Sequence, residues 1–225
     1  MRVLATVATV ATVATAWAQP LPDPVALAVR AERALGDPDA LTELRFTFVV
    51  ESQGEERARR THVWRPREGT LRVQVGEEEV LLRGVRGRDL DRAARDPEGH
   101  RELWEAVSPG TDAALAARSW SAFINDSFWL YAPVRLRAPG ATLSYAEGWL
   151  RVVYGDVGVT PGDRYELRVG DDGRVQEWRY RLSAGREGRW TWSDYREVGP
   201  LSVSLRREST DGNTVIRFED VAAEP

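Results

Sequence analysis

The sequence contains no cysteine. A chain without thiols forms no disulfide framework, holds no thiolate-ligated metal and offers no cysteine for N-terminal lipid attachment. Lysine is also absent, since all 31 basic residues are arginine. Arginine stays protonated and acts neither as a general base nor as an amine nucleophile, so lysine-based mechanisms such as Schiff-base catalysis are excluded.

Histidine is scarce. His62 and His100 are the only two, and neither lies in a zinc-binding pattern. The sequence also lacks a Gly-x-Ser-x-Gly elbow and a glycine-rich phosphate loop. We therefore predict a protein that is not an enzyme and that holds no metal or other cofactor. The formal net charge of -4, with both signs interspersed, predicts no nucleic-acid partner.

The sequence has one long hydrophobic run, at its start. Residues 3–16 are all Val, Leu, Ala or Thr, they follow Arg2, and Ala16-Trp17-Ala18 supplies the small residues that signal peptidase requires. We predict a signal peptide over residues 1–18 and an exported protein, periplasmic or extracellular, with no transmembrane anchor after cleavage. The alternative is a retained N-terminal helix.

The remaining chain reads as strands interrupted by helices. Asp23 and Pro24 are suited to begin a helix over residues 23–35, whose apolar stripe is Val25, Leu27, Ala28, Ala31 and Leu35. Two further helices are expected over residues 98–107 and 111–125. Period-two patterns and turn residues predict about eleven strands. These strands are expected over residues 41–50, 59–65, 70–75, 79–84, 142–145, 149–155, 164–170, 174–183, 189–198, 201–207 and 214–219.

The order of these elements predicts the fold class. The chain has four strands, then a helical segment, then seven more strands, with no break in composition. This order favours a single domain over residues 19–225. We expect a mainly β protein with helices (α+β), in which a large curved antiparallel sheet or half-barrel is covered by helices.

A dense aromatic segment carries a resemblance. Asn125-Asp126-Ser127-Phe128-Trp129-Leu130 and Pro133 match a motif of uncharacterised secreted bacterial proteins, which also tend to carry Gly-x-Thr-Pro-Gly-Asp-x-Tyr, present here at residues 158–165, and a later Trp, here Trp178. The chain also resembles, more loosely, the Lol-type (LolA/LolB-like) periplasmic lipoprotein carriers. This resemblance implies an open sheet that holds an apolar cavity under a helical lid and accepts a lipid or acyl chain.

Several aromatic residues are the candidate lining of this cavity or its lid. They are Trp64, Trp120, Phe123, Phe128, Trp129 and Tyr131. Asn125, Asp126, Pro133 and Asp163 are expected to have structural roles, the first two as C-capping residues and Asp163 as a turn residue. Arg72, Arg83, Arg135 and Arg137 either form exposed ion pairs, which is the more common role of such residues, or clamp an anionic head group.

Three functions remain open at this point. The first is an extracytoplasmic binding or carrier protein for a hydrophobic ligand such as a lipid, an acyl chain or a lipoprotein. The second is a structural or interaction module of the cell envelope, with a fully packed core, that binds a partner protein through an edge strand or exposed aromatic residues. The third is a carbohydrate hydrolase that uses Asp126 and a Glu across an open cleft.

Overall fold

The computed structural model describes residues 21–155 and 161–225. The predicted signal peptide and its cleavage site lie outside the described residues, as does the stretch 158–160 of the second motif. Within the described ranges, no helix is both long enough and apolar enough to cross a membrane.

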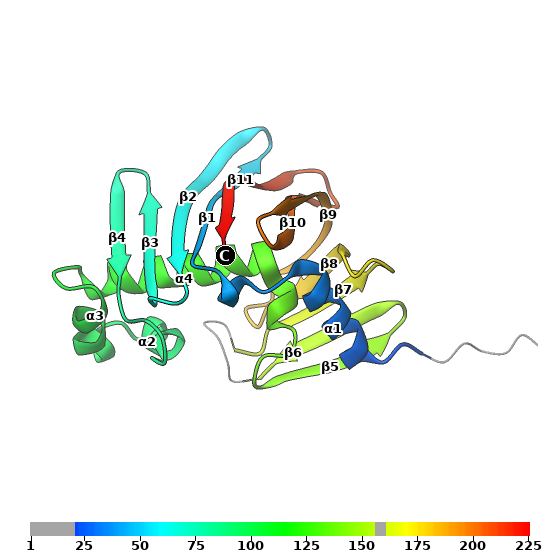
Figure 1. The fold of residues 1–225 in the computed structure, drawn as a ribbon, viewed down its shortest axis with the longest axis horizontal. Coiled ribbons are helices and arrows are strands. Elements are labelled where there is room, and N and C mark those ends of the chain that lie inside the picture. Colours follow the sequence, from blue (N-terminus) through cyan, green and yellow to red (C-terminus); the bar gives the residue numbers. More distant parts are fainter. Residues whose placement is uncertain (1–20, 156–160) are drawn as a thin grey trace, which may run out of the picture.

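Eleven strands form one antiparallel sheet, in agreement with the predicted fold class (Figure 1). Their order across the sheet is β4-β3-β2-β1-β11-β10-β9-β8-β7-β6-β5. The strands are β1 (Glu43–Ser52), β2 (Glu55–Arg65), β3 (Thr70–Val75), β4 (Glu78–Leu82), β5 (Ala141–Ala146), β6 (Trp149–Tyr154), β7 (Arg164–Val169), β8 (Val175–Arg181), β9 (Glu187–Val198), β10 (Leu201–Ser209) and β11 (Thr214–Glu224).

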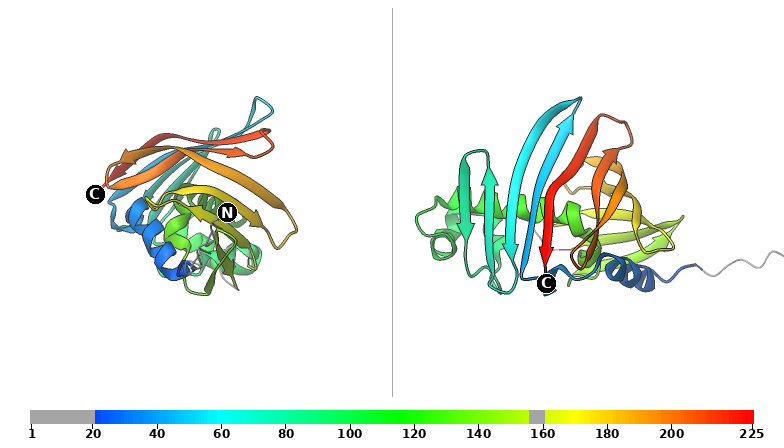
Figure 2. Two further views of the ribbon diagram at one scale, coloured as in Figure 1. Left: turned by 90° about the vertical axis from the view of Figure 1, so that its right-hand side faces the viewer. Right: turned by 45° about the horizontal axis from the view of Figure 1, so that its top comes forward.

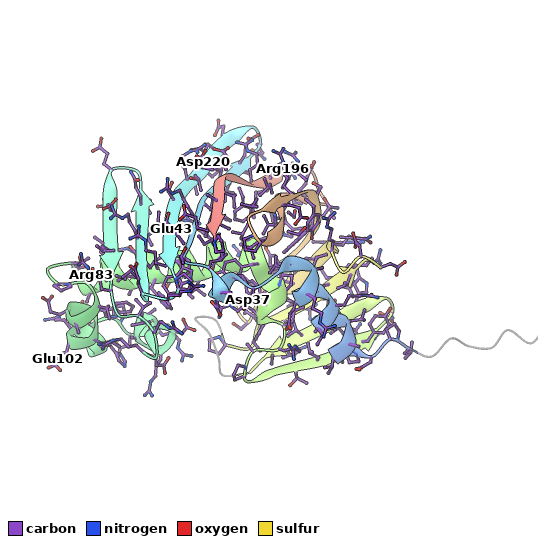
Figure 3. The ribbon with its side chains drawn as sticks, in the orientation of Figure 1. Asp37, Glu43, Arg83, Glu102, Arg196 and Asp220 are labelled. Carbon is purple, nitrogen blue, oxygen red and sulfur yellow. The ribbon has the colours of Figure 1, made fainter. Side chains whose placement is uncertain are left out.

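The sheet curves over its helices, so that one face is concave (Figure 2). Register shifts interrupt the pairing of β1 with both of its neighbours and of β7 with β8. Such bulges increase the local twist of a strand, which favours a curved sheet over a flat one. Charged side chains such as Arg83, Glu102, Arg196 and Asp220 project outward into solvent (Figure 3).

The longest helix, α4 (Ala113–Tyr131), lies across the concave face (Figures 1 and 2). The chain leaves β4 at one edge of the sheet and must reach β5 at the other edge. A helix of this length spans about 28 Å at 1.5 Å per residue, and it supplies most of that crossing. Asp112 caps its start by accepting a hydrogen bond from the Leu115 amide at 3.0 Å.

The predicted end of this helix is wrong. Asn125 and Asp126 do not cap it, because α4 continues to Tyr131 and is followed directly by the 3₁₀ turn η3 (Ala132–Arg135), which contains the buried Pro133. A polar residue inside a helix is normally a sign of exposure or of a cap. Asp126 is instead fully buried, because side chains from β2 bind it across the core.

The other helices flank α4. The helix α1 (Pro24–Leu35) begins at Asp23 and ends at Gly36, as predicted, and it buries Leu27, Ala28, Ala31 and Leu35. Val25 is 49 % exposed and does not belong to the buried stripe. The helix α2 (Leu90–Arg95), which was not predicted, packs against α4. The helix α3 (Arg101–Val107) follows the turn η2 (Glu98–His100).

The hairpin between β7 and β8 is positioned by a glycine. Gly173 has φ +83°, and a Cβ atom there would lie 2.7 Å from the Ala34 side chain and 2.8 Å from the Arg30 carbonyl oxygen. Both the left-handed backbone and the contact with α1 therefore require glycine. The turn is closed by the Gly173 amide, which donates to the Gly170 carbonyl at 3.0 Å.

Candidate functional site

A cavity of about 690 Å³ lies between α4 and the sheet. Its walls come from α2, the second half of α4, η3 with the residues after it, and the β6–β8 region. This volume is within the range of pockets that hold one small ligand. The described residues that line it are Asp89, Asp91, Arg95, Ser121, Ile124, Asn125, Ser127, Phe128, Trp129, Arg135, Ala138, Pro139, Tyr154, Asp163, Tyr165, Trp178, Tyr180, Leu182 and Arg186.

One wall of the cavity is aromatic. The Phe128 ring on α4 contacts the rings of Tyr165, Trp178 and Tyr154 on the sheet, with centroids 4.9, 5.3 and 6.0 Å apart. Tyr180 extends this wall beside Tyr165, at 6.3 Å. The rings meet edge to face or tilted, which is the arrangement that their quadrupoles favour. The result is an apolar surface whose members hold one another in place.

A tryptophan stack joins this wall to the core. Trp129 on α4 lies parallel to Trp178 on β8, with centroids 4.7 Å apart and an interplanar angle of 3°. Trp178 stacks in turn on Trp192, and Trp190 meets Trp129 edge to face. Trp178 is almost fully buried. Because interiors are packed at crystal density, this stack resists collapse of the cavity.

Two tyrosines of the wall remain protonated at neutral pH. Burial raises the pKa of the Tyr165 phenol, and the nearby carboxylate of Asp163 raises it further. Burial likewise raises the pKa of Tyr154. Each hydroxyl donates a hydrogen bond, Tyr165 to Asp163 Oδ2 at 3.1 Å and Tyr154 to the Arg135 carbonyl at 2.9 Å. The phenols therefore offer the cavity apolar ring surface and no charge.

Asp163 connects two hairpins at the cavity. It is buried, and its Oδ1 accepts a hydrogen bond from the Ser183 amide at 2.9 Å while its Oδ2 accepts the Tyr165 hydroxyl. It thus joins the start of β7 to the turn after β8. Asp163 was expected to be a turn residue, and its position is buried and bridging, not that of a simple surface turn.

The cavity lining also contains charged residues. Asp89, Asp91 and Arg95 come from the α2 region, Arg135 from η3, and Arg186 from the turn before β9. Asp89 caps α2 through the Arg92 amide, and Asp91 accepts the indole N–H of Trp120 at 2.9 Å. The lining therefore combines aromatic and charged residues, which suits a ligand that has both an apolar and a polar part.

A buried polar network attaches α4 to β2. Asp126 accepts two hydrogen bonds of 2.7 Å from the Arg60 guanidinium and one of 2.7 Å from His62 Nε2. Because a carboxylate only accepts, His62 carries its proton on Nε2. Although burial opposes the charge of Arg60, hydrogen bonding to Asp126 raises its pKa above the usual arginine value. This network fixes the helix from which Phe128 and Trp129 enter the cavity wall.

A second buried cation lies under the end of α4. Arg207 on β10 is fully buried, with its guanidinium carbon 3.9 Å from the Trp192 ring centroid and 4.8 Å from that of Phe218. Nη1 donates to the backbone and side-chain oxygens of Ser204, and Nη2 to the Leu130 carbonyl at 3.4 Å. Burial lowers the pKa of Arg207.

The predicted aromatic residues divide between two places. Phe128 and Trp129 line the cavity. Trp64, Trp120 and Phe123 instead form a separate cluster, in which Phe123 lies 5.6 Å from Trp64 and 5.9 Å from Trp120, and Tyr131 is buried beside Arg135. None of these four belongs to the lining of the cavity. For Trp120, Phe123 and Tyr131 this follows from the helical period, which turns successive residues of α4 toward different neighbours. Trp64 lies on β2, which is remote from β6–β8 in the order of the sheet.

The wall residues Tyr154, Tyr165 and Tyr180 were missed as candidates. They alternate with outward-facing residues on strands, so each looks like an ordinary core position. The Gly-x-Thr-Pro-Gly-Asp-x-Tyr stretch is the one sequence signal that marks Tyr165. Among the described residues, no three His, Asp or Glu side chains converge in a way that could hold a metal ion.

The comparisons with known proteins are sparse. No family model matches the sequence, and no curated protein matches it significantly. Among solved structures, a LolA superfamily protein from Nitrosomonas europaea is similar over 90 % of this chain and 94 % of its own, with 10 % identity and a TM-score of 0.47. A similarity of this degree assigns neither a family nor a ligand.

Proposed function

We propose that the protein is an exported, non-catalytic binding or carrier protein for a hydrophobic ligand. The observation that carries this proposal is the cavity of about 690 Å³, walled by Phe128, Trp129, Tyr165 and Trp178. Concave sites with a predominantly aromatic wall and a few polar groups are typical of small-ligand sites. Export, to a periplasm or out of the cell, rests on the N-terminal sequence.

The cavity favours this proposal over the interaction module. That alternative requires the helices to fill the concave face completely, whereas a space of ligand size separates part of α4 from β6–β8. The hydrolase hypothesis requires Asp126 to face an open cleft. Asp126 is fully buried and bound by Arg60 and His62, so it is not placed for that role.

The test is to block the cavity without disturbing the core. Ser121 is half-buried on α4 and lines the cavity, so Ser121→Trp places an indole in the ligand space. Ala114→Trp is the matched control, because Ala114 is half-buried on the same helix face two turns away and outside the lining.

The protein is purified without detergent from a host that exports it. Bound ligand is then measured by native mass spectrometry of the protein and by solvent extraction of the ligand. We expect a near-stoichiometric amphiphile on the wild type and on Ala114→Trp, and its loss from Ser121→Trp. A wild-type protein that is free of ligand and gains no mass on addition of dodecanoate or dodecyl maltoside contradicts the proposal.

A further inference from the structure

The arginines singled out in the sequence have different surroundings. Arg72 pairs with Glu79 at 3.0 Å, and Arg137 pairs with Glu32 on α1 through two contacts of 2.9 Å. Both are ordinary surface pairs, as expected. Arg135, two residues before Arg137, forms no ion pair with any carboxylate in the described part of the chain and lines the cavity instead.

Arg135 is exposed to solvent and lies on the wall of the cavity. Its guanidinium carbon lies 6.0 Å from the Tyr131 ring centroid, and its own carbonyl accepts the Tyr154 hydroxyl. The backbone of Arg135 is thereby attached to the aromatic wall. Its guanidinium is held close to the head of a ligand whose chain packs on that wall.

A second guanidinium contacts the wall at Tyr180. Arg186 is exposed on the turn before β9, with its guanidinium carbon 5.8 Å from the ring centroid of Tyr180. It too forms no ion pair with the described carboxylates and lines the cavity. The acidic residues of the lining have other polar partners, since Asp89 caps α2, Asp91 binds Trp120 and Asp163 binds Ser183 and Tyr165. Burial opposes the charge of Arg135, but the carboxylates of Asp39 and Asp91 nevertheless help to raise its pKa, although neither forms an ion pair with it.

We infer that the cavity selects a single-chain amphiphile with a monoanionic head, whose chain packs on the aromatic wall while Arg135 binds the head. This inference rests on the proposed function and names its ligand class. A guanidinium presents paired donors that match a carboxylate or a phosphodiester. Asp89 and Asp91 in the same lining oppose additional negative charge, which disfavours a dianionic head.

The test compares four dodecyl amphiphiles below their micelle concentrations by isothermal titration calorimetry with the whole protein. Dodecanoate and dodecanoyl lysophosphatidylglycerol carry monoanionic heads, dodecyl maltoside is neutral, and dodecyltrimethylammonium is cationic. We expect at least one anionic probe to bind at least ten times more tightly than the neutral and cationic ones. Which anionic probe binds more tightly distinguishes a fatty acid from a phospholipid-derived ligand.

Arg135→Gln should weaken binding of the preferred anion by about ten-fold to a hundred-fold, the range for a lost charged hydrogen bond, and leave dodecyl maltoside unaffected. Arg137→Gln is the matched control, because it removes the same charge two residues away and outside the cavity. Thermal unfolding of both variants verifies that each folds.

The outcomes separate the two proposals. Binding of all four probes with equal affinity, or an unchanged anion affinity in a folded Arg135→Gln variant, overturns the head-group inference and leaves the carrier proposal standing. If no probe binds the wild type, the carrier proposal fails as well.

Discussion

The buried network of Asp126 makes a sharp prediction about stability. Asp126→Ala removes a fully buried carboxylate that accepts four hydrogen bonds, two from Arg60 and one from His62 at 2.7 Å and one from the Asn125 side-chain amide at 2.9 Å. It leaves a half-buried guanidinium without its counter-ion and a buried imidazole N–H without an acceptor. Breaking a buried pair from one side costs about 3–5 kcal/mol, so we expect a loss of about 4 kcal/mol in the free energy of unfolding.

A double variant of Arg60 and Asp126 distinguishes the loss of this network from a loss of packing. Arg60→Met keeps the aliphatic stem near the Phe48 ring, over which the guanidinium lies at 5.0 Å, but leaves Asp126 without its counter-ion. Combining it with Asp126→Leu removes both charges together. The combined loss should be smaller than the sum of the single losses by about 2 kcal/mol or more, since the two residues share one network.

The assay is equilibrium unfolding in urea, with the free energy obtained by linear extrapolation. Arg72→Met is the control, because it breaks the exposed pair with Glu79 and should cost at most about 1 kcal/mol. A loss below about 1 kcal/mol for Asp126→Ala, or strictly additive losses in the double variant, would refute the reasoning.

Two further predictions concern the turn before β8 and the buried tyrosines. Gly173→Ala should lower the free energy of unfolding by about 2–4 kcal/mol, because a strained φ is combined with a clash against α1. Gly212→Ala, with φ +73° and open space around it, should lower it by only about 1–2 kcal/mol. Equal losses in urea unfolding would contradict the contact between Gly173 and α1. Burial raises the pKa of Tyr195 to about 12 and raises those of Tyr154 and Tyr165 as well. The unfolded chain therefore releases these protons first, so stability is complete below about pH 10 and falls above it by up to about 1.4 kcal/mol per pH unit for each tyrosine. A urea midpoint that stays constant to pH 11.5 would disprove this linkage.

The strands could be predicted because their patterns are local. Leu44, Phe46 and Phe48 alternate with outward residues on β1, and the Gly170–Gly173 turn is explicit in the sequence. The end of α4 could not be predicted in the same way. A helix that continues through Asn125 and Asp126 depends on Arg60 and His62, more than sixty residues away, and no local signal reports that contact.

The candidate site was predictable only in part. The aromatic segment of α4 marked Phe128 and Trp129, but the face of the helix that meets the cavity is decided by where α4 lies on the sheet. Trp64, Trp120 and Phe123 are also aromatic, but they pack together outside the cavity. Arg135 could be recognised as different from Arg137 only after Glu32 on α1 was seen to pair with the latter.

The most direct test of the central claim, that the cavity binds an amphiphile, is a crystal structure of the protein with 12-bromododecanoate. Anomalous scattering locates the bromine atom independently of how the acyl chain is placed in the electron density. The account predicts a bromine peak against the wall of Phe128, Tyr165 and Trp178, with the carboxylate at Arg135. Bromine sites confined to the outer face of the sheet, with the cavity empty at a saturating concentration, would contradict it.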